Sequence, residues 1–229
     1  MIDRAQLLSD LQKLLRTLES DLLERSESDD VPEVGQALRA EYQKAKKAER
    51  TAQSYEEWRS DYITQIAAAW VLSCVFARFL EDNRLVDPPR ISGQSSVVSD
   101  QLSGSRLQRA RDEHELYFRT HPTHTDREYL LWVFSELRKL PACTEIFDPR
   151  QYSVAGDQLS EAQTENYKLT TDNFLSGDAA GELLKFFQKI HANTGALVHD
   201  FTDPNWDTRF LGDLYQDLSE AARKKYALL

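Results

Sequence analysis

The stretch IAAAWVLSCVFARFL, Ile66 to Leu80, is followed directly by the polar run EDNR and decides the fold. It is the one segment of this acidic, polar chain that is apolar nearly all round. A helix of that kind is typical of the middle of a helical domain, with other helices packed on most of its faces. Ser54 and Glu57 have the spacing of a capping box, and the pair Pro88-Pro89 cannot continue a helix. We therefore predict a buried central helix over about residues 55–85.

The apolar run does not indicate a membrane protein. It is shorter than the roughly 18–20 apolar residues that cross a bilayer, and Ser73 and Arg78 interrupt it. The N-terminus lacks the apolar core and the cleavage site of a signal peptide, so we expect a soluble, cytoplasmic protein without membrane contact. Cys74 and Cys143 are too few for a disulfide framework and have no metal-binding spacing, which predicts two buried, reduced thiols.

Length and charge set further limits. A chain of 229 residues can bury a substantial core as one large domain or two small ones. Its formal net charge of -10 argues against a protein that coats nucleic acid through bulk charge. A local basic face remains open.

Helical periodicity runs through most of the chain. Residues 3–25 place leucines at steps of three and four, as an amphipathic helix requires, and Pro32 suits the first turn of the next helix. Ser54, Thr125 and Ser176 stand at predicted helix starts. Further helices are predicted over residues 33–52, 106–118, 126–140, 178–191 and 207–226, with irregular stretches near 88–105 and 148–175. No long alternating segment indicates a substantial sheet. The predicted fold is all-α, a multi-helix bundle around one buried central helix. We expect a single domain over 1–229, with subdomains 1–90 and 106–229 as the open alternative.

Four patterns invite an enzymatic interpretation, and each lacks a necessary part. His121 and His124 have no third ligand for zinc, and the run 112–115 (DEHE) has no second histidine at metal-helix spacing. His199-Asp200 has no nucleophile. In 87–90 (DPPR), Arg90 replaces the aromatic residue that stacks on a flipped base in amino-methyltransferases. No group provides nucleophile, base and stabilising donor together, so we assign no catalytic, cofactor-binding or metal residue in this chain and predict a binding, positioning or scaffolding module.

Basic residues gather in two places. The helix predicted over 33–52 is the most basic stretch, and a second cluster lies near the C-terminal end of the sequence. Such cations can contact DNA phosphates, which fixes register without reading sequence, or they can form a solvated helix face. The candidate DNA-binding residues are Arg39, Lys44, Lys46, Lys47, Arg50, Arg223, Lys224 and Lys225. For a protein-interaction role, exposed aromatic anchors would be Tyr42, Tyr55 or Trp206, with burial in the core as the equal alternative for these residues.

Two segments carry a family resemblance. Residues 70–85 (WVLSCVFARFLEDNRL) and residues 210–218 (FLGDLYQDL) with 222–226 (ARKKY) resemble runs that precede the catalytic core of large adenine-specific DNA methyltransferases. Three more segments, 112–118, 126–130 and 199–204, make the chain most similar to the PglX-type enzymes of the BREX (phage growth limitation) antiviral systems, type 2 form.

The resemblance implies that the chain is the N-terminal helical domain of such a methyltransferase. The catalytic domain, with its S-adenosylmethionine motif and its Asn/Asp-Pro-Pro-aromatic motif, would lie outside the chain. The parent enzyme would methylate adenine N6. Two hypotheses follow for this domain: it supports the catalytic core and helps to position DNA, or it docks other defence-system subunits, or dimerises, without touching DNA.

Overall fold

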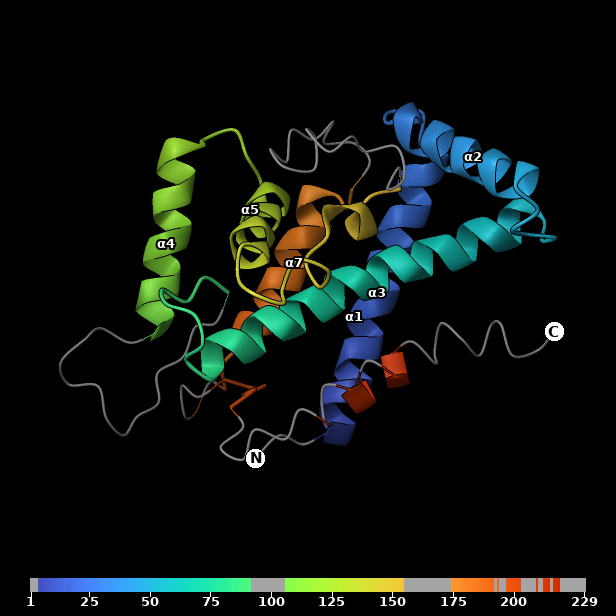
Figure 1. The fold of residues 1–229 in the computed structure, drawn as a ribbon. Coiled ribbons are helices and arrows are strands. Elements are labelled where there is room, and N and C mark those ends of the chain that lie inside the picture. Colours follow the sequence, from blue (N-terminus) through green and yellow to red (C-terminus); the bar gives the residue numbers. More distant parts are fainter. Residues whose placement is uncertain are drawn as a thin grey trace.

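The computed structural model describes residues 4–91, 106–154, 174–191, 193, 197–202, 209, 212–214 and 216–218 (Figure 1). Its elements are α1 (Arg4–Glu27), α2 (Pro32–Lys47), α3 (Tyr55–Asp82), α4 (Arg106–Thr120), α5 (Asp126–Arg138), the 3-10 helix η1 (Pro149–Tyr152) and α7 (Gly177–Gln188). In the part of the chain that the structure describes, extended pairing is limited to one isolated bridge between Ile190 and Leu197. The all-α prediction is confirmed.

Helix α3 is the centre of the molecule. It packs against α1, α2, α5, α7 and η1, and Figure 1 shows it crossing α1 along most of the molecule's width. Trp70, Val71, Cys74 and Ala77 on this helix are fully buried, as an apolar surface on nearly every side demands. Length and hydropathy alone would let α3 span a bilayer, but 78% of its most apolar window is buried inside the protein, which is typical of a core helix.

The predicted helix starts are confirmed. Ser54 accepts a hydrogen bond from the backbone N–H of Glu57, and the Glu57 carboxylate accepts one from Ser54 N at 3.0 Å. The same reciprocal arrangement joins Thr125 and Glu128, and the Ser176 hydroxyl accepts from Ala179 N at 3.0 Å. Each cap satisfies backbone donors that have no partner within their helix.

Two helix ends differ from the prediction. α2 stops at Lys47 rather than near residue 52, because Glu49 takes a left-handed conformation with φ 55° and lets Arg50 N donate to Ala45 O at 2.9 Å. α3 stops at Asp82 rather than near residue 85, because Arg84, with φ 60°, lets Leu85 N donate to Leu80 O at 2.8 Å. Both are turns that glycine usually occupies. Such a turn cannot be predicted from a glutamate or an arginine in the sequence.

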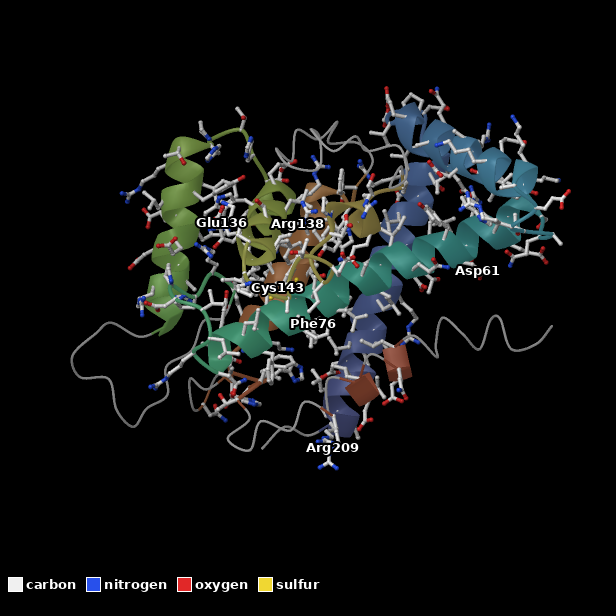
Figure 2. The ribbon with its side chains drawn as sticks, viewed as in Figure 1. Asp61, Phe76, Glu136, Arg138, Cys143 and Arg209 are labelled. Atoms are coloured by element: carbon white, nitrogen blue, oxygen red, sulfur yellow. The ribbon has the colours of Figure 1, made fainter. Side chains whose placement is uncertain are left out.

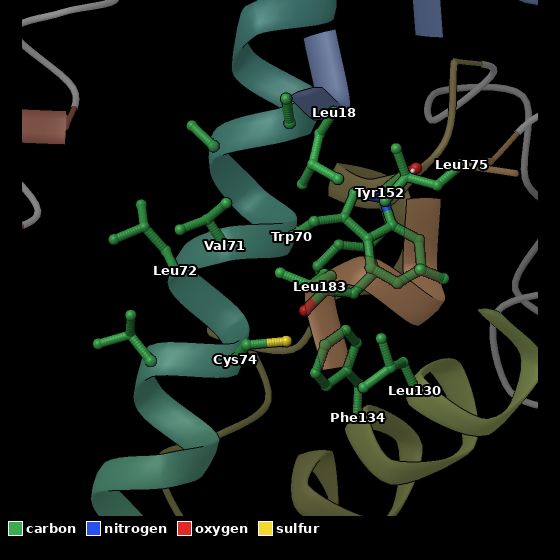
Figure 3. Packing of buried hydrophobic residues seen from close by; sticks show 14 of the residues in the cluster. Leu18, Trp70, Val71, Leu72, Cys74, Leu130, Phe134, Tyr152, Leu175 and Leu183 are labelled. Atoms are coloured by element: carbon green, nitrogen blue, oxygen red, sulfur yellow. Dashed lines mark hydrogen bonds between the residues drawn. The ribbon is translucent and has the colours of Figure 1, made fainter. Parts of the chain in front are cut away.

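The stretch predicted to be irregular over 148–175 contains one short 3-10 helix, η1, and several of its described residues (148–154 and 174–175) belong to the hydrophobic core. Tyr152, Phe174 and Leu175 are almost completely buried. Trp70 Nε1 donates to the Tyr152 backbone carbonyl at 3.1 Å, and the Tyr152 hydroxyl lies 2.7 Å from Ser73 Oγ. Figure 3 shows Tyr152 beside Trp70 in the core. The 3-10 helix η1 is therefore packed against α3 through Tyr152. At the C-terminal end, residues 212–214 and 216–218 are helical, which agrees with the predicted helix there.

Candidate functional site

The five basic residues predicted on the second helix are all exposed, and three of them already have partners within the protein. Lys44 pairs with Glu41 at 3.2 Å, and the Glu41 side chain is only 4% exposed. The Lys46 ammonium lies 5.4 Å from the centre of the Tyr42 ring, and the Arg39 guanidinium lies 5.8 Å from that of Tyr55. Cation–π contacts of this kind stabilise the corner between α2 and α3. These three cations are thus partly structural.

Lys47 and Arg50 differ from the other three. Both are exposed, and no side-chain hydrogen bond or ion pair joins either one to another described residue. They lie on either side of the left-handed Glu49, where the chain leaves α2 and turns toward α3. Among the described residues they are the cations of this helix best placed to meet an external anion. The other predicted cluster, Arg223, Lys224 and Lys225, lies outside the described residues.

Aromatic rings line the corner between α2 and α3. The Tyr42 ring centre lies 5.4 Å from that of Tyr55 and 5.5 Å from that of Trp58, and Trp58 stacks on Tyr62 at 4.8 Å. Tyr42 is 6% exposed and its hydroxyl donates to the Gln53 carbonyl at 2.9 Å. It is therefore a core residue rather than an exposed interface anchor. Tyr55 is half-buried beside it, and Trp206 lies outside the described residues.

The histidine pair of the α4–α5 turn is an aromatic packing feature. The rings of His121 and His124 stack at 4.8 Å, and His121 stacks on Tyr117 at 4.5 Å. His124 Nδ1 lies 2.8 Å from the Tyr117 hydroxyl. Burial raises the pKa of Tyr117 to about 12, so this hydroxyl stays protonated at neutral pH. No group of three metal-ligating side chains occurs anywhere in the described part of the chain.

The other three enzymatic patterns also make structural contacts. His114 Nε2 lies 2.8 Å from Asp126 Oδ1 and ties α4 to α5. Asp200 accepts from Thr202 N at 2.9 Å, a contact typical of aspartate in a turn. Asp87 pairs with Arg109 at 2.6 Å, and the Arg90 guanidinium lies 4.9 Å from the centre of the Trp132 ring.

A buried polar cluster at the end of α3 was not singled out from the sequence. Arg78 is completely buried and donates to the backbone carbonyls of Phe187 and His199 and to the Asp82 carboxylate, the last at 2.8 Å. Asp82 also accepts from Phe201 N at 3.0 Å. Asn83 donates to the Phe201 carbonyl at 2.9 Å. We call Arg78, Asp82 and Asn83 the α3 clamp, because they fasten Phe187, His199 and Phe201 to the end of α3.

His199 belongs to the segment that the clamp holds. Its ring stacks on Phe186 at 5.1 Å, and its Nε2 lies 3.6 Å from Asp10 on α1. Burial lowers the pKa of His199, with Arg78, Lys189 and His191 acting in the same direction and Asp10 opposing them. The neutral imidazole of His199 contacts Phe186 on α7 and lies close to Asp10 on α1, and it adds no charge to the core.

The α3 clamp brings together two segments that carry the family resemblance, 70–85 and 199–204. The whole chain also aligns with the adenine-specific methyltransferase PglX of Streptomyces coelicolor, with 41% identity over 236 positions. This chain is similar throughout to the N-terminal part of PglX. It spans 17% of the length of that protein. No family model matches the chain, and no solved structure matches it.

The α3 clamp and His199 lie within segments that carry the sequence resemblance. Arg78, Asp82 and His199 are buried, and their hydrogen bonds fix how α7 and the 197–202 segment sit on α3. A PglX-like sequence here therefore indicates a shared helical architecture.

Proposed function

We propose that the chain is the non-catalytic N-terminal helical region of an adenine-N6 DNA methyltransferase in a cytoplasmic, BREX-like phage-defence system. In this role it supports the S-adenosylmethionine-dependent catalytic part and helps to position DNA. The observation that carries the proposal is the 41% identity to PglX over the whole chain. In this proposal S-adenosylmethionine and the methyl transfer belong to the remaining part of the methyltransferase.

The DNA contact is assigned to the end of α2. Lys47 and Arg50 are exposed and have no intramolecular partner among the described residues, and the exposed Lys44 and Lys46 lie one turn or less away. A small cluster of this kind binds phosphates without reading bases. Because the chain has a net charge of -10, repulsion from the rest of the surface limits the affinity, and we expect weak binding that depends steeply on salt.

Fluorescence anisotropy with a labelled duplex of about 30 base pairs tests this assignment. Replacing Lys47 and Arg50 by Glu removes two phosphate contacts, so the slope of log K against log salt should become shallower by about 2. The matched control replaces Lys139 and Lys185 by Glu. These lysines are exposed and lie away from α2, where Lys139 pairs with Glu136 and Lys185 with Glu182. The change in net charge is the same as in the Lys47 and Arg50 variant. Equal effects of both double variants would mean that only bulk charge matters, and α2 would have no specific contact.

A protein-interaction role is the second candidate. It is favoured by the intramolecular contacts of Arg39, Lys44 and Lys46, which leave fewer cations for DNA. In that case the chain docks other subunits of the defence assembly and DNA recognition belongs to the rest of the enzyme. The unmodified chain would then show no binding to the duplex even at low salt.

A further inference from the structure

A groove runs along one face of α3. It encloses about 540 Å³ between α3 and residues 145–153. Its α3 side consists mainly of apolar side chains at helical spacing, namely Tyr62, Ile66, Ala69, Leu72 and Phe76. From Tyr62 to Phe76 this stripe is about 21 Å long at 1.5 Å per residue. Figure 2 labels Phe76 near the middle of the molecule.

The lining of the groove suits apolar side chains and does not suit DNA. Tyr62, Ala69 and Phe76 keep part of their surface accessible, while Ile66 and Leu72 form a nearly buried floor. The lining contains one cation, Arg150, which pairs with Asp148 at 2.5 Å, and one exposed acid, Glu145. A phosphate backbone would meet an apolar floor and an acid there, which is unfavourable. This groove and the Lys47–Arg50 corner are therefore suited to different partners.

The shape of the groove selects among protein partners. In a two-fold dimer each copy presents the same patch to the other, and two concave patches leave a void between them. The occupant must instead be convex, such as one face of an amphipathic helix laid against the stripe. A second copy of the chain, using this groove on both sides, does not meet that requirement.

We propose that the groove receives an apolar, convex element from the remaining part of the methyltransferase and so holds this region against it. The length of the relative supports this occupant, because the chain spans only 17% of PglX and the larger remainder would be covalently linked to it. Linkage places such a segment at high effective concentration, so a small apolar contact suffices. This inference rests on the proposed function and adds to it the surface through which the catalytic part is supported.

Thiol labelling tests the groove directly. Ala69→Cys places a thiol in the groove, and Ala40→Cys places one on the exposed side of α2 as the control. Native Cys74 and Cys143 are buried, so they react slowly with a maleimide. Labelling rates are measured in this chain alone and in the complete methyltransferase of which it is the N-terminal region. Gln65→Cys is a second groove probe in case Ala69→Cys perturbs folding, since Gln65 lines the groove and is exposed.

The expected result is at least tenfold slower labelling of the groove thiol in the complete protein than in the chain alone, with no change at the α2 thiol. Equal rates in the two proteins would overturn the proposal. Labelling of the groove thiol that is already slow in the chain alone would also overturn the proposal. If that rate depended on protein concentration, a second copy would cover the groove. If it did not, the chain's own residues would cover it. DNA binding through α2 is measured separately, so the two proposals fail independently.

Discussion

Replacing Arg78 by Met removes the central residue of the α3 clamp. Met keeps an apolar stem of similar length, so the change deletes the guanidinium with little loss of packing volume. The guanidinium is completely buried and bonds two backbone carbonyls and the Asp82 carboxylate, whose side chain is 1% exposed. Its removal leaves that carboxylate buried without its counter-ion. The variant therefore tests whether the motif residues of this region hold the fold together.

The size of the effect follows from this geometry. Breaking a buried ion pair from one side costs about 3–5 kcal/mol, and the two carbonyl contacts are not additive with it because they share one side chain. A domain of this size loses about 2–4 °C in midpoint per kcal/mol. We therefore expect the free energy of unfolding to fall by about 3–5 kcal/mol and the thermal midpoint to fall by about 6–20 °C.

Urea unfolding followed by circular dichroism measures the loss. Arg119→Met is the control, because Arg119 pairs with Glu115 on the surface, with side chains 70% and 64% exposed, and such pairs contribute under about 1 kcal/mol. Adding Asp82→Asn to Arg78→Met should recover part of the stability, since the amide oxygen can still accept from Phe201 N while the unpaired charge is gone. A loss below about 1 kcal/mol for Arg78→Met, or no recovery in the double variant, would refute the assignment of the clamp as the main polar link from α3 to Phe187, His199 and Phe201.

Two smaller changes test other parts of the structure. Glu49→Gly relieves the left-handed φ of 55° at the end of α2 and should raise the free energy of unfolding by about 1 kcal/mol. The control Glu33→Gly, in the first turn of the same helix, should lower it. Urea midpoints measure both, and a loss of stability at position 49 would contradict the left-handed conformation there. His199 is kept neutral by burial, its pKa lying below 6.5 in the folded state. The unfolded chain therefore takes up the proton first, and stability falls as pH drops below about 6.5 toward the lowered folded pKa. His199→Gln should flatten this dependence in unfolding curves taken between pH 7 and pH 5, and identical curves for both proteins would mean that other groups titrate.

The sequence predicted the parts of the fold that depend on local chemistry. The apolar run of α3 and the caps at Ser54, Thr125 and Ser176 were found because periodicity and capping act within a few residues. The burial of Tyr152 and Phe174 was missed because their partners, such as Trp70, are about 80 to 100 residues away in the sequence. The ends of α2 and α3 were misplaced because Glu49 and Arg84 adopt a backbone conformation that their residue types rarely show.

For the candidate site, the charges were read from the sequence but their partners were not. Lys44 and Lys46 were chosen for charge alone, although Glu41 and Tyr42 precede them at the helical spacing of three and four residues at which side chains meet and do engage them. Lys47 and Arg50 carry the same charges but have no such partner among the described residues. The spacing of three and four residues was the signal that could have separated the two pairs. The α3 clamp was hidden for the opposite reason, since Arg78 looks like an interruption in an apolar run until the carbonyls of residues 187 and 199 are placed beside it.

Buried residues within the segments that carry the resemblance say more about the fold than about function. The clamp residues of α3 and the 199–201 segment meet in the interior, so a relative can keep them solely to keep the architecture. Surface positions such as Lys47, Arg50 and Ala69 carry the proposed contacts, and a surface substitution changes stability little. Identity to PglX therefore supports the fold of this region more strongly than either contact. If Arg78→Met abolishes DNA binding only by unfolding the chain, while Lys47 and Arg50 variants weaken it in a stable protein, architecture and DNA contact will have been separated experimentally.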